Sequence, residues 1–368
     1  MKFKKPILFV IVIIFSVLSQ TIEAQNVIST KTSPEYEKYI DSLKKEPYKW
    51  RFPIMGQEIR KQGFDIPYPV GFSLQYVYGN MMIGIDSLRV GLKDDPMGWV
   101  GVDSLVTFNS INPASNVVIA RYDVWLLPFF NVYAIGGYMD TNTSVKMTLD
   151  FLDQPTVNFS TGSKGPMVGW GTTIAAGVDN WFLTADYNQV WTFVPQLDSP
   201  AFSQEADIRI GHTFDFKKNR PWSNISVMAG GSWLKLNSKS QGNANLTDMF
   251  GVGKNKPELL DKLNNWWDGL GPKEQEKLQP FYDTMEAWLS DDSDTLIYYG
   301  FNKKLPQAWS MTLGADYQLN HRWSINTIFT FLGSREQFTV GVNYRFGFKG
   351  KNLFAGDIDR KLMHKVKQ

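Results

Sequence analysis

Side chains that can act as a base or nucleophile near neutral pH are scarce in this 368-residue chain, which has three histidines and no cysteine. His212 lies in a segment of alternating apolar and polar residues, and Ser226 and Ser232 lie in the next such segment. A histidine beside a serine hydroxyl is the pair with which hydrolases attack an ester, and on a lipid-facing surface the substrate would be a lipid. Because no acid stands at a spacing that would orient His212, we expect no catalytic residues and no enzymatic activity, and lipid modification stays as an alternative.

Charged residues recur on the polar face of several alternating segments. A β-strand points successive side chains to opposite faces, so these charges would share one side of a sheet. Inside a membrane barrel such charges are costly unless they are paired or solvated. Three arginines stand against four aspartates, which favours ion pairs that stiffen the interior over an ion-selective pore. Together with one asparagine, the predicted polar network is Arg121, Asp123, Asp186, Asp207, Arg209, Asp316, Asn343 and Arg345.

A short repeat, Gly-Ile-Asp-Ser-Leu at 84–88 and Gly-Val-Asp-Ser-Leu at 101–105, contains Asp86 and Asp103. If a turn lies near 94–95, these two carboxylates face each other across a hairpin, where calcium would relieve their repulsion. We favour the alternative that the repeat marks two strand entries, and we expect no metal and no cofactor. The sequence has no phosphate-binding loop or zinc motif, and a net charge of +2 gives no reason to expect nucleic acid as a partner.

The elements that must position these residues are β-strands, and the clearest runs from 336 to 348. Its apolar and aromatic side chains fall on one face, and its polar side chains fall on the other. That pattern suits lipid outside and a polar interior, and a composition of 25 Phe, 15 Tyr, 13 Trp and 30 Gly at a mean hydropathy of −0.25 agrees with it. The predicted strands are 70–80, 83–92, 100–110, 115–126, 130–140, 166–178, 180–193, 204–215, 223–237, 307–319, 322–333 and 336–348.

The predicted fold is therefore all-β, a transmembrane antiparallel up-and-down β-barrel of about 12 strands. Connection lengths support it, because counting back from the last strand makes alternate connections short. The short set is 320–321, 217–221, 179–180 and 128–129, and the other set is 333–335, 237–307, 194–203 and 139–165. Short periplasmic turns and longer external loops are typical of outer-membrane barrels, whereas a soluble sandwich, the alternative for an exported chain, has no reason to separate them.

Aromatic residues near the predicted strand ends favour the membrane interpretation, because interfacial girdles lie there. Aromatic residues that packed a sandwich core would instead favour positions in the middle of strands. The predicted girdle contains Trp125, Trp181, Trp233, Trp309, Trp323 and Phe348.

The remaining segments flank or interrupt the barrel. Residues 1–24 have early lysines, an apolar run and a small residue before Gln25, as a secretory signal peptide does. Residues 25–68 form a predicted periplasmic segment with short helices near 34–45 and 56–63. The barrel spans 69–348, and residues 349–368 form a basic periplasmic tail.

Residues 238–306 are predicted to form an extracellular helical insertion within the barrel. The stretches 257–269 and 272–289 have apolar residues at helical spacing. Their apolar faces would cover each other, the barrel rim or another protein, and we favour a self-packed helical hairpin. The candidate partner-binding residues are Trp266, Trp267, Phe281 and Trp288.

Several stretches resemble a poorly characterised family of Gram-negative outer-membrane β-barrel proteins of Bacteroidetes type. They are 55–63 running into 67–71, then 121–133, 179–182 and 341–346. The resemblance covers most of residues 50–348, and it implies barrel architecture with no catalytic residue to carry over. The insertion and the tail are additions to the family pattern.

We therefore expect a protein of the cell outer membrane that acts as a structural or accessory subunit of an outer-membrane complex, for example in assembly or transport. A narrow pore or transporter for small solutes is the second hypothesis, and a lipid-modifying enzyme is the third. The expected partners are outer-membrane lipid and lipopolysaccharide, and proteins that bind the insertion or the tail.

Overall fold

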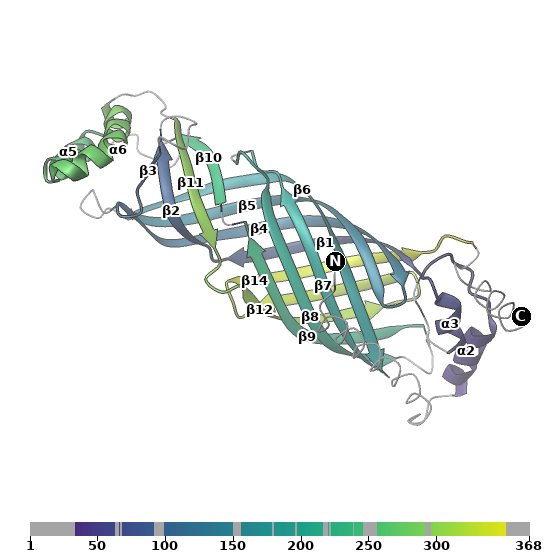
Figure 1. Cartoon of the computed structure of the whole chain (residues 1–368). Helices are drawn as coiled ribbons and strands as arrows, with labels where there is room; N and C mark the ends of the chain where they lie inside the picture. The colour runs from purple at the N-terminus through teal and green to yellow at the C-terminus, as the bar shows by residue number, and fades with distance from the viewer. Residues whose placement is uncertain are drawn as a thin grey trace, which may run out of the picture.

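A computed structural model describes residues 34–62, 66, 68–91, 99–149, 156–178, 180–195, 197–215, 220, 222–237, 239–245, 256–290 and 296–350. Ten antiparallel strands close into a barrel in the order β1-β14-β13-β12-β9-β8-β7-β6-β5-β4 (Figure 1). Their bounds are β1 (Val70–Met81), β4 (Val106–Leu127), β5 (Phe130–Leu149), β6 (Thr156–Val178), β7 (Trp181–Thr192), β8 (Ala201–Asp215), β9 (Asn224–Leu236), β12 (Trp309–Gln318), β13 (Trp323–Phe331) and β14 (Arg335–Phe346).

Closure joins the first and last strands of the barrel. β1 pairs with β14 from Val70 opposite Phe346 to Met81 opposite Arg335, and its other edge pairs with β4. Each remaining barrel strand likewise pairs with two neighbours. Every edge is thus covered, and backbone groups find their partners within the barrel, as a chain in lipid requires.

The predicted number of about 12 strands is wrong, because the barrel has ten. Residues 84–91 form β2 (Gly84–Gly91), which belongs to a separate four-stranded sheet, and the predicted strand 100–110 is divided between β3 (Val100–Gly101) and the start of β4. β4 then continues without a break through Pro113, although a break was predicted there. Pro113 lies beyond Ala114, the last β4 residue paired with β1, so the missing N–H costs little on that edge.

Three barrel strands are much longer than a membrane crossing needs. β4, β5 and β6 have 22, 20 and 23 residues, whereas a tilted strand crosses a bilayer in about nine to eleven. Their excess length projects beyond one end of the barrel, where a smaller sheet and two helices pack (Figure 1). The small sheet has the order β10-β11-β2-β3, with β10 (Lys239–Asn245) and β11 (Leu296–Lys304), and the helices are α5 (Lys256–Asp268) and α6 (Pro272–Ser290).

We call this projection the head, and its described residues are 84–91, 99–105, 239–245, 256–290, 296–304 and the far ends of β4 and β5. It has its own hydrophobic core, in which Trp288 is 1% exposed. Helical and strand residues interlock there, so the head is a packed unit built on the barrel. The buried members are Val102, Leu105, Met147, Leu149, Leu263, Phe281, Met285, Trp288 and Leu289.

The opposite end of the barrel carries the β4–β5, β6–β7, β8–β9 and β12–β13 connections, each of at most eight residues, and we call it the turn end. The N-terminal segment crosses it through α2 (Pro34–Lys45), α3 (Gly56–Lys61) and the stretch between them. Arg51 N donates to Phe348 O at 3.0 Å, and Ile54 N donates to Leu126 O at 2.9 Å. These bonds attach the segment to both the exit of β14 and the end of β4.

Side chains alternate between the two faces of the barrel wall as a membrane strand requires. On β1, Phe72 points outward and is 47% exposed, whereas Ser73 points inward and is 5% exposed. The same alternation places Ile210 and Leu313 outside and Thr312 inside. An apolar outer face and a polar inner face follow. No helix among the described residues is long and apolar enough to span a bilayer.

Not all of the predicted girdle residues have side chains on the outer face of the barrel. Trp181, Trp309, Trp323 and Phe348 are exposed on the outer face, and Trp233 stands opposite Trp309 in the register. The prediction for Trp125 is wrong. It stands opposite Asn131 and shares the parity of Asp123, so the strand alternation assigns it to the inner face.

Candidate functional site

The turn end of the barrel interior is crossed by a chain of polar contacts that we call the turn-end network. Arg345 Nη2 lies 3.1 Å from Asp123 Oδ2, and Asn131 Nδ2 donates to the same oxygen at 2.8 Å. Arg121 Nη2 donates to Asn131 Oδ1 at 3.2 Å, and its guanidinium lies 3.6 Å from the centre of the Tyr133 ring. Three strands, β14, β4 and β5, are thereby tied together at this level.

The N-terminal segment adds to this closure. Arg345 Nε donates to Tyr68 O at 2.7 Å, so the same guanidinium holds both Asp123 and the chain that enters β1. Trp50 packs against Gly347 so closely that a Cβ there would lie 2.4 Å from its ring. Tyr48 lies in the N-terminal segment, outside the barrel strands. Its burial raises the pKa of its hydroxyl well above the usual range, and this hydroxyl donates to Phe52 O at 2.8 Å. The segment is therefore packed against the barrel end.

A second set of contacts, the central network, lies nearer the head. Arg209 bridges two carboxylates, with Nη1 3.1 Å from Asp186 Oδ2 and Nη2 3.1 Å from Asp207 Oδ2. Arg335 Nη1 lies 2.6 Å from Glu205 Oε1, and Arg335 also donates to Ser232. Arg209 is thus held by carboxylates of its own strand and of the neighbouring β7, whereas Arg335 reaches across the interior from β14 to β8.

The structure brings together six of the eight predicted network residues, in two groups. Arg121, Asp123 and Arg345 belong to the turn-end network, and Asp186, Asp207 and Arg209 belong to the central one. Asp316 and Asn343 face the interior opposite Asn326 and Ser324. Within the described residues, no hydrogen bond or ion pair joins either of them directly to the two networks.

Two residues of the central network, Glu205 and Arg335, were not among those predicted from the sequence. Glu205 shares the inward parity of Asp207 and Arg209 on β8, so the alternation contained the signal. Arg335 was placed in a loop, whereas it is the first residue of β14 and points across the interior to β8. No local pattern in the sequence reveals that contact, because its partner lies 130 residues away.

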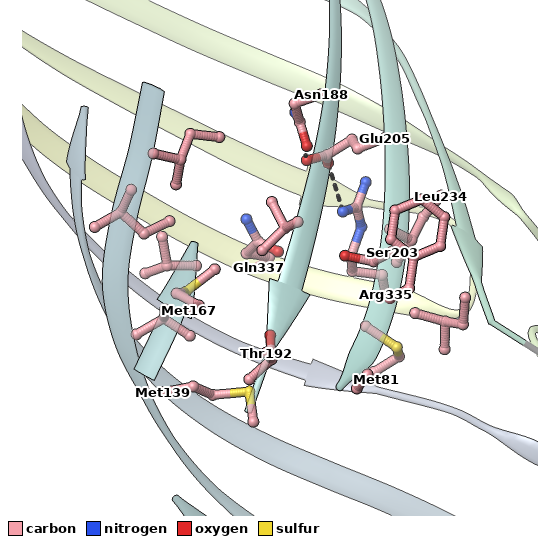
Figure 2. A pocket seen from close by; sticks show the side chains of 18 of the residues that line it. Met81, Met139, Met167, Asn188, Thr192, Ser203, Glu205, Leu234, Arg335 and Gln337 are labelled. Carbon is pink, nitrogen blue, oxygen red and sulfur yellow. Dashed lines mark hydrogen bonds and ion pairs between the residues drawn. The ribbon is translucent and has the colours of Figure 1, made fainter. Parts of the chain in front are cut away.

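The interior on the head side of Arg121 is hollow, with a cavity of about 750 Å³. Figure 2 shows Met139 and Met167 on one side of it and Asn188, Glu205 and Arg335 on the other. The methionine side continues over five neighbouring strands, β1, β4, β5, β6 and β7. We call it the apolar wall, and it comprises Val77, Val117, Ile119, Ile135, Met139, Met167 and Val190.

The head end of the cavity is lined by chain from outside the barrel wall. Leu197 in the β7–β8 connection forms a β-bridge with Gly242 of β10, which brings this connection beside the head. Lys239 of β10 and Lys303 of β11 line the cavity at this level. Burial lowers the pKa of the Lys303 ammonium, and no ion pair compensates its charge within the described residues.

The pair proposed for lipid hydrolysis is not assembled. His212 pairs with Trp181 and Val227 in the register and packs between the rings of Trp181 and Phe214, on the outer face. Ser226 stands opposite Thr213, and Ser232 binds Arg335, so both serines point inward. A barrel wall separates the base from either hydroxyl, and the geometry cannot support that chemistry.

The two aspartates of the short repeat each have a separate protein partner. Lys304 Nζ lies 3.0 Å from Asp86 Oδ2, and Leu88 N donates to Asp103 Oδ1 at 2.8 Å. In the described part of the chain, no group of three or more metal-ligating side chains comes together.

Of the four residues considered for partner binding, two are inaccessible. Phe281 and Trp288 are buried in the head core, because the apolar faces of α5 and α6 meet each other and the ends of β4 and β5. Trp266 lies against the edge of this core, with its ring 6.3 Å from that of Phe281. Trp267 stacks on Tyr282 at 4.3 Å and is only partly covered.

No protein-family model matches the sequence, and no curated protein matches it. The β domain of the Bordetella autotransporter BrkA shares 8% identity, over 77% of this chain and 100% of that chain, with a TM-score of 0.34. The translocator domain of the Neisseria meningitidis autotransporter NalP shares 11%, over 78% and 92%, with a TM-score of 0.30. A Pseudomonas aeruginosa FadL homologue shares 10%, over 77% and 93%, with a TM-score of 0.23.

Identities and TM-scores this low carry no argument about what the barrel does. The closed strand order and the apolar outer face stand on their own, and they are those of an outer-membrane β-barrel.

Proposed function

We propose that this outer-membrane barrel is a structural or accessory subunit of an outer-membrane protein complex, with the head as the part that meets a protein partner. The head carries the proposal. Three strands extend far beyond the length needed to cross the membrane. The extension of β5 contributes Met147 and Leu149 to a core that also contains residues of two helices, and Val102, just before β4, joins the same core. A platform of this kind has no role in crossing lipid.

Sidedness follows from the connections. Outer-membrane barrels have short turns in the periplasm and longer connections outside, so the turn end faces the periplasm and the head faces the exterior. The N-terminal segment is then periplasmic and the insertion between β9 and β12 is extracellular. The outer face contacts membrane lipid and, in the outer leaflet, lipopolysaccharide. A basic tail that binds a periplasmic protein stays a prediction, since residues 351–368 lie outside the described part of the chain.

The closed turn end supports an accessory role over a wide pore. Arg345 ties β14 to β4 and to Tyr68 at the level where solutes would leave. Trp50 and the backbone bonds of Arg51 and Ile54 attach a further layer of chain. A narrow pore for small solutes is the second candidate, and the cavity of about 750 Å³ on the head side favours it.

Site-specific photocrosslinking in cells tests the proposed role. A benzophenone amino acid at Asn265, on the exposed side of α5, is expected to capture a defined protein, whereas the same probe at lipid-facing Ile208 captures lipid. Absence of any protein adduct from Asn265 and from a second exposed position, Glu276 on α6, would remove the head as the contact surface.

A further inference from the structure

The apolar wall is unusual for a membrane barrel, whose interior is ordinarily polar. Its seven residues face a cavity rather than lipid, and most remain partly accessible from it. Apolar surface in contact with water costs about 25 cal/mol for each Å² that could be covered. An apolar ligand that covered the apolar wall would therefore be stabilised by the hydrophobic effect.

The rest of the cavity lining carries charged side chains among apolar ones such as Leu234 and Ile328. Arg121, Arg209, Arg335, Lys239 and Lys303 line the cavity against three carboxylates, an excess of two positive charges. Those three carboxylates, Asp186, Glu205 and Asp207, are all held by Arg209 or Arg335.

The cations without a carboxylate partner lie at the two ends of the cavity. Arg121 at the floor binds only the Asn131 amide and the Tyr133 ring within the described residues. Lys303 at the head end has no ion pair there, and it is partly buried. A buried cation without a counter-ion is costly, and an anionic group placed beside it would offset that cost.

We propose that the head-side cavity of the barrel binds a small anionic amphiphile, such as a medium-chain carboxylate. Its apolar chain lies along the wall formed by Met139, Met167 and their neighbours, and its anionic group lies at Lys303 and Lys239. A cavity of about 750 Å³ falls within the range of small-molecule sites. This site is independent of the proposed head contact and would remain if the protein had no partner.

Calorimetric titration of the full chain in lipid nanodiscs tests the proposal, with empty nanodiscs subtracted for partition into lipid. Three probes share one chain and differ in the head group: decanoate, decanol and decylammonium. Decanoate is expected to bind saturably, and both other probes at least about tenfold more weakly, since a charge-assisted bond is worth about one factor of ten or more.

Variants separate the two halves of the site. Lys303→Met is expected to raise the decanoate Kd about tenfold, and Lys303→Arg to keep it within about threefold. Replacing both wall methionines, Met139→Gln with Met167→Gln, is expected to weaken all three probes about equally. Lys164→Met is the matched control, because Lys164 is an exposed cation paired with Asp140 on the outside of the cavity lining.

Heat-modifiable gel mobility verifies that each variant is folded. Equal affinity for all three probes would overturn the anionic head group. Absence of saturable binding above empty nanodiscs, or a Lys303→Met protein that binds decanoate as the parent does, would overturn the proposal.

Discussion

Replacing Arg335 with methionine should destabilise the barrel severely, because it removes the only described ion pair of Glu205. The Arg335 side chain is 7% exposed and that of Glu205 is 28% exposed, and Nη1 lies 2.6 Å from Oε1. Removing one member of a buried pair costs about 3–5 kcal/mol, since the other charge is left uncompensated. Glu205 is open to the cavity and keeps some solvation, so we expect the lower end, about 3 kcal/mol.

The same reasoning predicts that the second partner can be removed at little further cost. Arg335→Met combined with Glu205→Gln leaves no uncompensated charge, and the amide can still accept from Ser232. We therefore expect the double variant to recover about 2 kcal/mol relative to the sum of the single changes. Lys164→Met is the matched control, since its exposed pair with Asp140 should contribute less than about 1 kcal/mol.

The assay is equilibrium unfolding in guanidinium with the barrel in lipid vesicles, followed by tryptophan fluorescence and by gel mobility. The slope of the free energy of unfolding against denaturant should be unchanged, so that a shift in midpoint reports stability. If Arg335→Met cost no more than Lys164→Met, or if the two single effects simply added, the pairing across the interior would not be holding the barrel together.

Three further outcomes follow from the structure. Burial lowers the pKa of Lys303 in the folded head, so the charged side chain destabilises the folded state below that pKa, and this destabilisation disappears as pH rises towards 10.5. Lys303→Met should therefore stabilise the head against heat at pH 7 and much less at pH 10. An equal gain in stability at both pH values would contradict this cause. Gly347→Val should displace Trp50 from the barrel end at a cost of about 1–3 kcal/mol, and trypsin should then cleave the N-terminal segment faster. The control Gly136→Val, at a position with open space, should leave that cleavage rate unchanged. His212→Ala should leave the lipid profile of the outer membrane as it was, and a specific loss of one lipid species would restore an enzymatic role.

Alternation in the sequence predicted the ten barrel strands, because each buries one face in lipid and the other in a polar interior. The same signal misassigned residues 84–91, since a strand in the head alternates too and nothing local distinguishes lipid from the head core. The outer halves of β5 and β6 were missed for the opposite reason. Residues 141–144 and 156–165 are rich in Thr, Ser, Asn and Gly, because they project beyond the membrane and need no continuous apolar face. Val145, Met147 and Leu149 do share one buried face, but it is too short to stand out as a strand signal.

The sequence predicted which charged residues face the barrel interior, but not which of them form ion pairs. Parity placed Asp186, Asp207 and Arg209 on one face, whereas which carboxylate meets which arginine depends on barrel closure and strand stagger. The apolar wall went unrecognised because Met139 and Met167 each look like ordinary strand residues, and only neighbouring strands assemble them into one surface.

The mass of the native particle, released from the outer membrane in mild detergent, tests the central proposal most directly. A subunit of a complex should appear in a discrete particle heavier than the chain alone, with a second protein present in a fixed ratio. The variant Asn265→Arg, which adds a charge to the exposed side of α5, should lose that second protein. A single copy of this chain in every preparation, with no second protein at fixed ratio, would contradict the proposed role.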